Sequence, residues 1–104
     1  MIETKYNEIY FESADVVSNM KRLVNQIWKL IPMRENNEDW KKQINLVIVE
    51  IVGLQEVFSN RLNLLKILSE LEGLKKYEEI EFFQFRSIVF SIISLMAKEN
   101  ERLV

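Results

Sequence analysis

Residues Trp40–Phe58, with the sequence WKKQINLVIVEIVGLQEVF, decide the fold of this chain. Apolar residues recur there at three- and four-residue spacing over nineteen positions, which is the pattern of one face of an α-helix. The set comprises Trp40, Ile44, Val47, Ile51, Leu54 and Phe58. Between residues 46 and 54 only Glu50 and Gly53 interrupt Leu, Val and Ile. Because a surface helix buries a single apolar stripe, we expect this helix to be covered from several sides.

The same segment has a second interpretation, because LVIVEIV is rich in β-branched residues and a short run of this kind can be a buried strand. Its length favours a helix, since strands usually have about 3–10 residues. Two glycines and one proline in 104 residues are also too few turn residues for a β-sandwich or barrel. The sequence therefore predicts an all-α fold, a small antiparallel bundle of about four helices that forms one domain over residues 1–104.

The first helix of this bundle has two possible starting points. Helical spacing runs through residues 4–31, but the helix can instead begin at Ser13 and leave residues 1–12 as a partly ordered arm. We expect Pro32 to end it, because a proline pushes the preceding residue out of the α region. Asn36 or Asn37 is then the expected N-cap of the central helix.

Two more helices are expected after the central one. A break at Ser59–Asn60 separates the central helix from a third helix that ends at Gly73, although one helix to residue 72 is the alternative. The last helix is expected over about residues 78–102, with a polar stripe that faces solvent and a wide apolar arc. The stripe consists of Gln84, Ser87, Ser91, Ser94, Lys98 and Arg102.

The composition excludes several chemistries. Without cysteine the chain has no disulfide, no thiolate zinc site and no cysteine nucleophile, and without histidine it lacks the commonest general base and metal ligand. The isolated glycines form no phosphate-binding loop. We therefore predict a protein that is not an enzyme, with no catalytic, cofactor-binding or metal-binding residues.

Two segments of the sequence bear on cellular location and on membrane association. The segment MIETKYNEIYFES lacks the basic and then apolar order of a signal peptide, so we expect a cytoplasmic protein. The apolar run at 82–97 has sixteen residues and includes an arginine and a glutamine. A helix needs about 20 apolar residues to span a bilayer, so no membrane association is expected.

Two alternative functions remain open. A nucleic-acid-associated accessory protein would use the basic residues between positions 21 and 42, but a net charge of −2 disfavours it. A remote alternative is a magnesium-dependent hydrolase that uses E-x-x-E pairs, Glu35 with Glu38 and Glu78 with Glu81. Acids at a helix start are also expected for the helix dipole alone. The basic set is Lys21, Arg22, Lys29, Arg34, Lys41 and Lys42.

Four residues are candidates for interactions. Arg86 lies within the apolar arc of the last helix and Glu50 within the most apolar part of the central helix. Arg86 either snorkels to water along Phe82 or pairs with a carboxylate across a helix contact, for which Glu50 is the expected partner. Trp28 and Trp40 flank the Pro32 connector and either close one end of the core or anchor a partner.

The predicted function follows from the excess of apolar helix surface. Two helices of a small bundle are apolar over more of their circumference than their neighbours can cover, and self-association or a protein partner resolves that excess. We expect a non-enzymatic protein-interaction or accessory module that forms a homodimer, or a higher even oligomer, through the central and last helices.

Overall fold

The computed structural model describes residues 2–4, 6, 10–76 and 81–102. Its helices are α1 (Ser13–Trp28), α2 (Leu30–Glu35), α3 (Trp40–Val57), α4 (Leu65–Lys76) and α5 (Phe82–Glu101). Two strands, β1 (Ile2–Glu3) and β2 (Tyr10–Phe11), form an antiparallel ribbon. The expected helical bundle is confirmed, and the segment that could have been a strand lies within α3.

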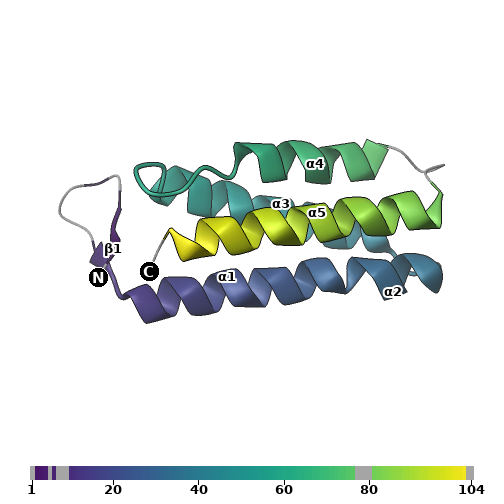
Figure 1. Ribbon diagram of the computed structural model, residues 1–104, viewed down its shortest axis with the longest axis horizontal. Coiled ribbons are helices and arrows are strands. Elements are labelled where there is room, and N and C mark those ends of the chain that lie inside the picture. Colours follow the sequence, from purple (N-terminus) through teal and green to yellow (C-terminus); the bar gives the residue numbers. More distant parts are fainter. Residues whose placement is uncertain (1, 5, 7–9, 77–80, 103–104) are drawn as a thin grey trace.

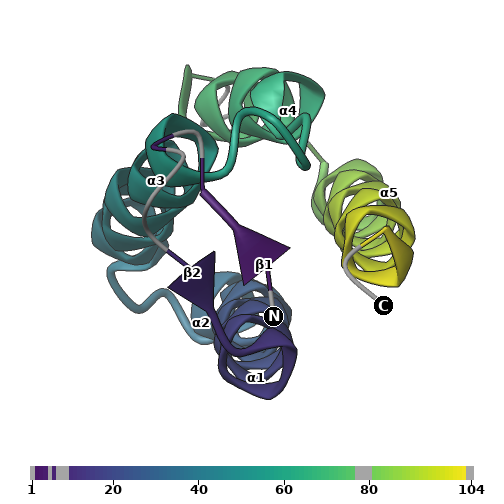
Figure 2. The same ribbon diagram turned by 90° about the vertical axis from the view of Figure 1, so that its left-hand side faces the viewer.

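The four longer helices form an antiparallel ring in sequence order (Figures 1 and 2). α1 packs on α3, α3 on α4 and α4 on α5, and α5 returns to α1. α3 and α5 therefore occupy opposite corners of the ring (Figure 2). The bundle measures 46 × 20 × 19 Å.

The core follows the helical spacing of the sequence. Each of α1, α3 and α5 contributes four buried apolar side chains at intervals of three and four residues, which places them on one face. They are Val16, Met20, Leu23 and Ile27 from α1, Ile44, Val47, Ile51 and Leu54 from α3, and Phe85, Val89, Ile92 and Met96 from α5. The polar stripe of α5 is exposed at all six expected positions, which confirms that it faces solvent.

The first helix begins at Ser13, the second of the two expected starting points. Pro32 does not end this helix as expected, because α2 includes it and continues to Glu35. The interruption lies one turn earlier, at Lys29. A proline lacks the N–H that would bond to the carbonyl four residues before it, and its ring crowds that carbonyl. In this chain that carbonyl belongs to Trp28, where α1 ends.

Asn37 ends α2 in a left-handed conformation, with φ of 56°. Around it, the Glu38 N–H donates to the Met33 carbonyl at 2.8 Å and the Asn37 N–H to the Arg34 carbonyl at 3.2 Å. This pair of bonds is a Schellman motif, in which asparagine is the usual substitute for glycine. The chain turns sharply here and reverses direction into α3.

The N-cap of α3 is Asp39, so the expected cap at Asn36 or Asn37 is wrong. The Asp39 carboxylate accepts a hydrogen bond from the Lys42 N–H at 3.2 Å. Asn36 and Asn37 are instead used to end the preceding helix. The polar segment 36–39 therefore serves two helix ends, because Asn36 and Asn37 end α2 and Asp39 caps α3.

The break at Ser59–Asn60 is confirmed, because α3 ends at Val57 and α4 begins at Leu65. Gln55 holds the intervening loop, since its side-chain oxygen accepts from the Leu64 N–H at 2.6 Å. Gly73 does not end the third helix as expected, because α4 continues to Lys76. The expected start of the last helix, near residue 78, lies outside the described residues.

The ribbon formed by β1 and β2 closes one end of the bundle (Figure 2). Ile2 pairs with Phe11 in the ribbon and is only 1% exposed. The Asn60 side chain donates to the Glu3 carbonyl at 3.2 Å and to the Thr4 carbonyl at 3.3 Å, which ties the ribbon to the loop after α3. The sequence predicted no strand here.

Candidate protein-interaction surface

The outer face of α3 carries exposed branched side chains. Leu46 is 57% exposed, Val49 70% and Val52 49%, although all three lie in the middle of a helix. Lys42 and Glu56, both exposed, bound this stretch at its two ends. We use "the α3 outer face" for the exposed residues Lys42, Asn45, Leu46, Val49, Val52, Gly53 and Glu56.

This exposure results from a helix that is apolar on two sides. The inner side of α3 already supplies Ile44, Val47 and Ile51 to the core. Its neighbours α1, α2 and α4 pack along that side and its flanks. The neighbouring helices therefore cover only part of α3, and the side that bears Leu46, Val49 and Val52 faces solvent.

A groove runs beside this face, between α1 and α3. One part has a volume of about 560 Å³, and Val16, Leu54 and Phe58 are among its lining residues. A second part of about 370 Å³ is lined by Leu46 and Val49 among others. The groove therefore extends the α3 outer face toward α1.

An ion pair divides the groove. Arg22 of α1 and Glu50 of α3 line both parts, and the Arg22 Nη2 lies 2.7 Å from the Glu50 Oε2. The Arg22 guanidinium also donates to the Asn19 side-chain oxygen at 2.7 Å. Since both charged side chains are nearly half exposed, the pair is a surface pair that keeps its contact with water.

Gly53 lies within this face, near the middle of α3. A Cβ added there would meet no atom within 4 Å, and no glycine among the described residues has a positive φ. Glycine inside a helix costs about 0.5–1 kcal/mol relative to alanine. Neither the backbone conformation nor packing within the chain accounts for a glycine at this position.

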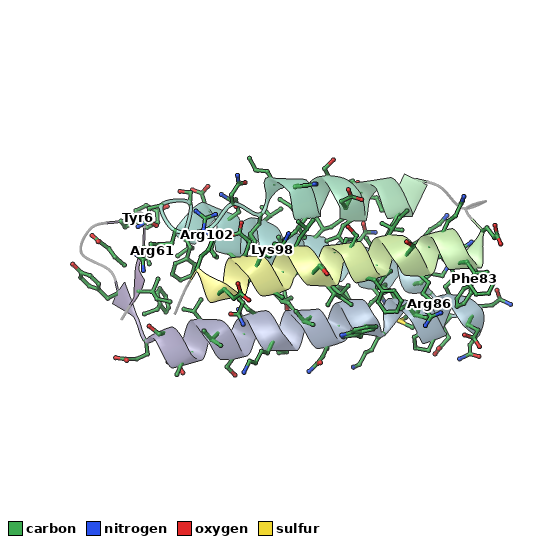
Figure 3. The ribbon with its side chains drawn as sticks, in the orientation of Figure 1. Tyr6, Arg61, Phe83, Arg86, Lys98 and Arg102 are labelled. Carbon is green, nitrogen blue, oxygen red and sulfur yellow. The ribbon has the colours of Figure 1, made fainter. Side chains whose placement is uncertain are left out.

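The expected ion pair between Arg86 and Glu50 is wrong. Glu50 pairs with Arg22, and α5 lies at the corner opposite α3. Arg86 is exposed, with its guanidinium carbon 5.0 Å from the centre of the Phe90 ring. It lies with Phe83 toward the start of α5, at the end of the bundle away from Tyr6 (Figure 3). The alternative, an arginine that reaches water along an aromatic ring, fits this position.

The two tryptophans have different environments. Trp40 is half-buried with its ring edge-on to buried Phe85, and the Arg34 guanidinium lies 4.6 Å from the centre of the same Phe85 ring. Trp40 therefore closes an end of the core. Trp28 is 42% exposed and meets Phe90 edge-on at 5.1 Å, so it belongs to an aromatic surface between α1 and α5.

The basic residues between positions 21 and 42 are used in part within the chain. Arg22 is held by Glu50, and Arg34 lies over Phe85. The Lys41 ammonium lies 5.7 Å from the centre of the Trp40 ring. Lys21, Lys29 and Lys42 are exposed.

The carboxylates considered for a metal lie in and around two connectors of the chain. Glu35 is the last residue of α2, Glu38 follows in the connector, and Glu78 lies outside the described residues. Within residues 2–4, 6, 10–76 and 81–102, no three acidic side chains gather where they could hold a metal ion. In the same part of the chain, no helix is long and apolar enough to cross a membrane.

Comparison with protein-family models, with curated proteins and with solved structures finds no match to this chain. A functional assignment therefore rests on the surface of the molecule itself. Its sharpest features are the α3 outer face, the groove beside it and the glycine within it.

Proposed function

We propose that this protein is a non-enzymatic interaction module that associates with a second copy of itself through the α3 outer face. The observation that carries the proposal is the exposure of Leu46, Val49 and Val52 on a helix whose other side is already packed. Exposed apolar residues that are contiguous mark interaction sites, whereas scattered ones are normal on a monomer.

The arrangement of the bundle supports assigning self-association to α3 alone. The apolar pattern of the sequence predicts one interface that the central and last helices share. α3 and α5 occupy opposite corners of the ring, so one interface between two copies reaches only one of them (Figure 2). On α5, the exposed polar stripe runs beside Phe83 and Phe90, whereas the middle of the α3 outer face is apolar.

Light scattering at tens of micromolar tests the proposal. We expect twice the 12.5 kDa mass of one chain for the wild type. Val49→Lys places a charge at the centre of the face and should give a monomer. The matched control is Leu65→Lys, which adds the same charge at an apolar residue of α4 that is 62% exposed, and it should remain a dimer.

Two results would refute the proposal. One is a wild-type monomer across this concentration range. The other is a dimer that Leu65→Lys disrupts and Val49→Lys does not. Circular dichroism of each variant checks that the helices are intact.

The nucleic-acid alternative receives less support from the positions of the basic residues. Arg22 and Arg34 are engaged by Glu50 and Phe85 within the chain. A nucleic-acid-binding surface needs several cations available to phosphates, and its affinity falls steeply with salt. Weak charge attraction alone should let the protein elute from heparin before the salt concentration reaches about 200 mM. Retention at higher salt would favour the nucleic-acid alternative.

A further inference from the structure

We infer that the two copies pair α3 against α3 in an antiparallel arrangement, about a twofold axis that passes beside Val49. The inference rests on the proposed self-association and adds the orientation, the register and the residues that select them. It is built from the α3 outer face, whose seven residues are all exposed.

The spacing along the face is symmetric about Val49, its most exposed branched residue. Residues three, four and seven positions away in either direction lie on the same side of a helix. In an antiparallel pair centred on Val49, each residue therefore meets the one equally far on the other side. The resulting pairs are Leu46 with Val52, Asn45 with Gly53 and Lys42 with Glu56.

The charges at the two ends of the face favour this orientation. Lys42 lies seven residues before Val49 and Glu56 seven residues after it. Antiparallel pairing places Lys42 beside Glu56 of the partner subunit, and the twofold axis repeats the contact. Parallel pairing about a twofold axis would place Lys42 beside Lys42 and Glu56 beside Glu56, so like charges would meet. The helix dipoles also oppose one another in the antiparallel pair.

The same register accounts for Gly53. In this pairing, position 53 faces Asn45 of the partner subunit. Within its own chain, the side-chain oxygen of Asn45 accepts a hydrogen bond from the Lys75 ammonium at 3.1 Å. A glycine leaves room for the asparagine at the approach of two helices, as small residues generally do. The empty space around position 53 in a single chain is then the space that a second copy fills.

Charge reversal tests the inference. Lys42→Glu brings a second carboxylate close to Glu56 of the partner subunit, and Glu56→Lys brings a second ammonium close to Lys42 of the partner subunit. Each variant alone should weaken the homodimer by about tenfold. An equimolar mixture of the two should recover a dimer made of one chain of each kind, because both contacts then join opposite charges. Native mass spectrometry distinguishes this mixed dimer by mass, and sedimentation velocity gives its affinity.

The fold should survive both substitutions. Lys42→Glu brings an acid to the first turn of α3 and Glu56→Lys brings a base to its last turn, and the helix dipole favours both changes. The matched control is Lys66→Glu, which makes the same change of charge at an exposed residue of α4 and should leave the homodimer unaltered.

The outcomes separate the two proposals. A wild-type monomer overturns both. If Val49→Lys disrupts the dimer but the mixture of Lys42→Glu and Glu56→Lys recovers no mixed dimer, self-association through α3 stands and the antiparallel register is wrong. Recovery of the mixed dimer, with Lys66→Glu unaffected, is the result expected here.

Discussion

At the scale of single residues, exposure decides how much each charged contact contributes. Arg22 and Glu50 are nearly half exposed, and such pairs contribute about 0–1 kcal/mol because water screens the charges. Arg86 lies over Phe90 on the surface, where a cation near an aromatic ring contributes about 0.5–1 kcal/mol. The Asp39 cap of α3 is expected to contribute more to stability than these surface charges, because it accepts a hydrogen bond from a backbone N–H that otherwise lacks a partner within the helix.

Replacing Arg86 with alanine should therefore cost less than about 1 kcal/mol of unfolding free energy, because no buried charge loses its partner. Urea unfolding of Arg86→Ala, Glu50→Ala and the double variant measures both the loss and any coupling. We expect the two losses to add, since the residues do not touch. A coupling energy above about 1 kcal/mol would contradict the arrangement of the bundle.

Replacing Asp39 with alanine should destabilise the protein by about 1 kcal/mol, because the N–H of Lys42 loses its side-chain acceptor. Glu38→Ala is the matched control, since it removes the neighbouring carboxylate, which does not cap α3. We expect its effect to stay within about 0.5 kcal/mol. Urea unfolding below the association range separates the two variants, and equal losses would argue against the cap.

At the scale of elements, the effect of Pro32 shows why helix boundaries are hard to predict. The residue removes a bond to the carbonyl one turn before it, so the interruption falls at Lys29, and the helix resumes through the proline. The helix end expected at Gly73 is also wrong. Glycine is common after a helix end, yet here α4 continues because its apolar residues Leu71 and Leu74 are buried.

The long helices could be predicted from spacing, and the ribbon could not. Helical periodicity extends over many residues and survives local exceptions, as the buried positions of α3 show. Each strand of the ribbon has two residues, which is too short for an alternating pattern to emerge. The partner of Glu50 also escaped prediction, because it depends on which helices become neighbours and not on the pattern of α3.

Gly53 and Gly73 provide a matched pair of substitutions. Both lie within helices, and a Cβ at either would meet nothing within 4 Å. Alanine at either position should stabilise the single chain by about 0.5–1 kcal/mol, because alanine loses less backbone entropy in a helix. Only Gly53→Ala should also weaken the dimer, since the added methyl group would stand in the interface. Urea unfolding at low concentration and sedimentation velocity at high concentration measure the two effects, and equal affinities for both variants would contradict the proposed register.

At the scale of the whole molecule, association and stability are linked. A partner that binds only the folded chain stabilises it by mass action, so the melting temperature of a dimer rises with protein concentration. We expect the wild-type melting temperature to increase by several degrees between about 1 and 100 µM, because 1 kcal/mol corresponds to about 4–8 °C for a domain of this size. Val49→Lys should melt at one temperature throughout this range. A wild-type melting temperature independent of concentration would contradict association.

The return of α5 to α1 has a consequence for the order in which the bundle forms. α3 and α4 are joined by the seven residues 58–64, whereas α1 ends at Trp28 and α5 begins at Phe82. The entropy lost on closing a loop grows with its length, so contacts between α3 and α4 form at lower cost than the contact that closes the ring. A hairpin of α3 and α4 alone leaves open the sides of α3 that α1 and α2 cover in the folded bundle, in addition to the side that bears Val49. We therefore expect a refolding chain to expose apolar surface on more than one side of α3, so that refolding at high protein concentration gives more aggregate than refolding from dilute solution.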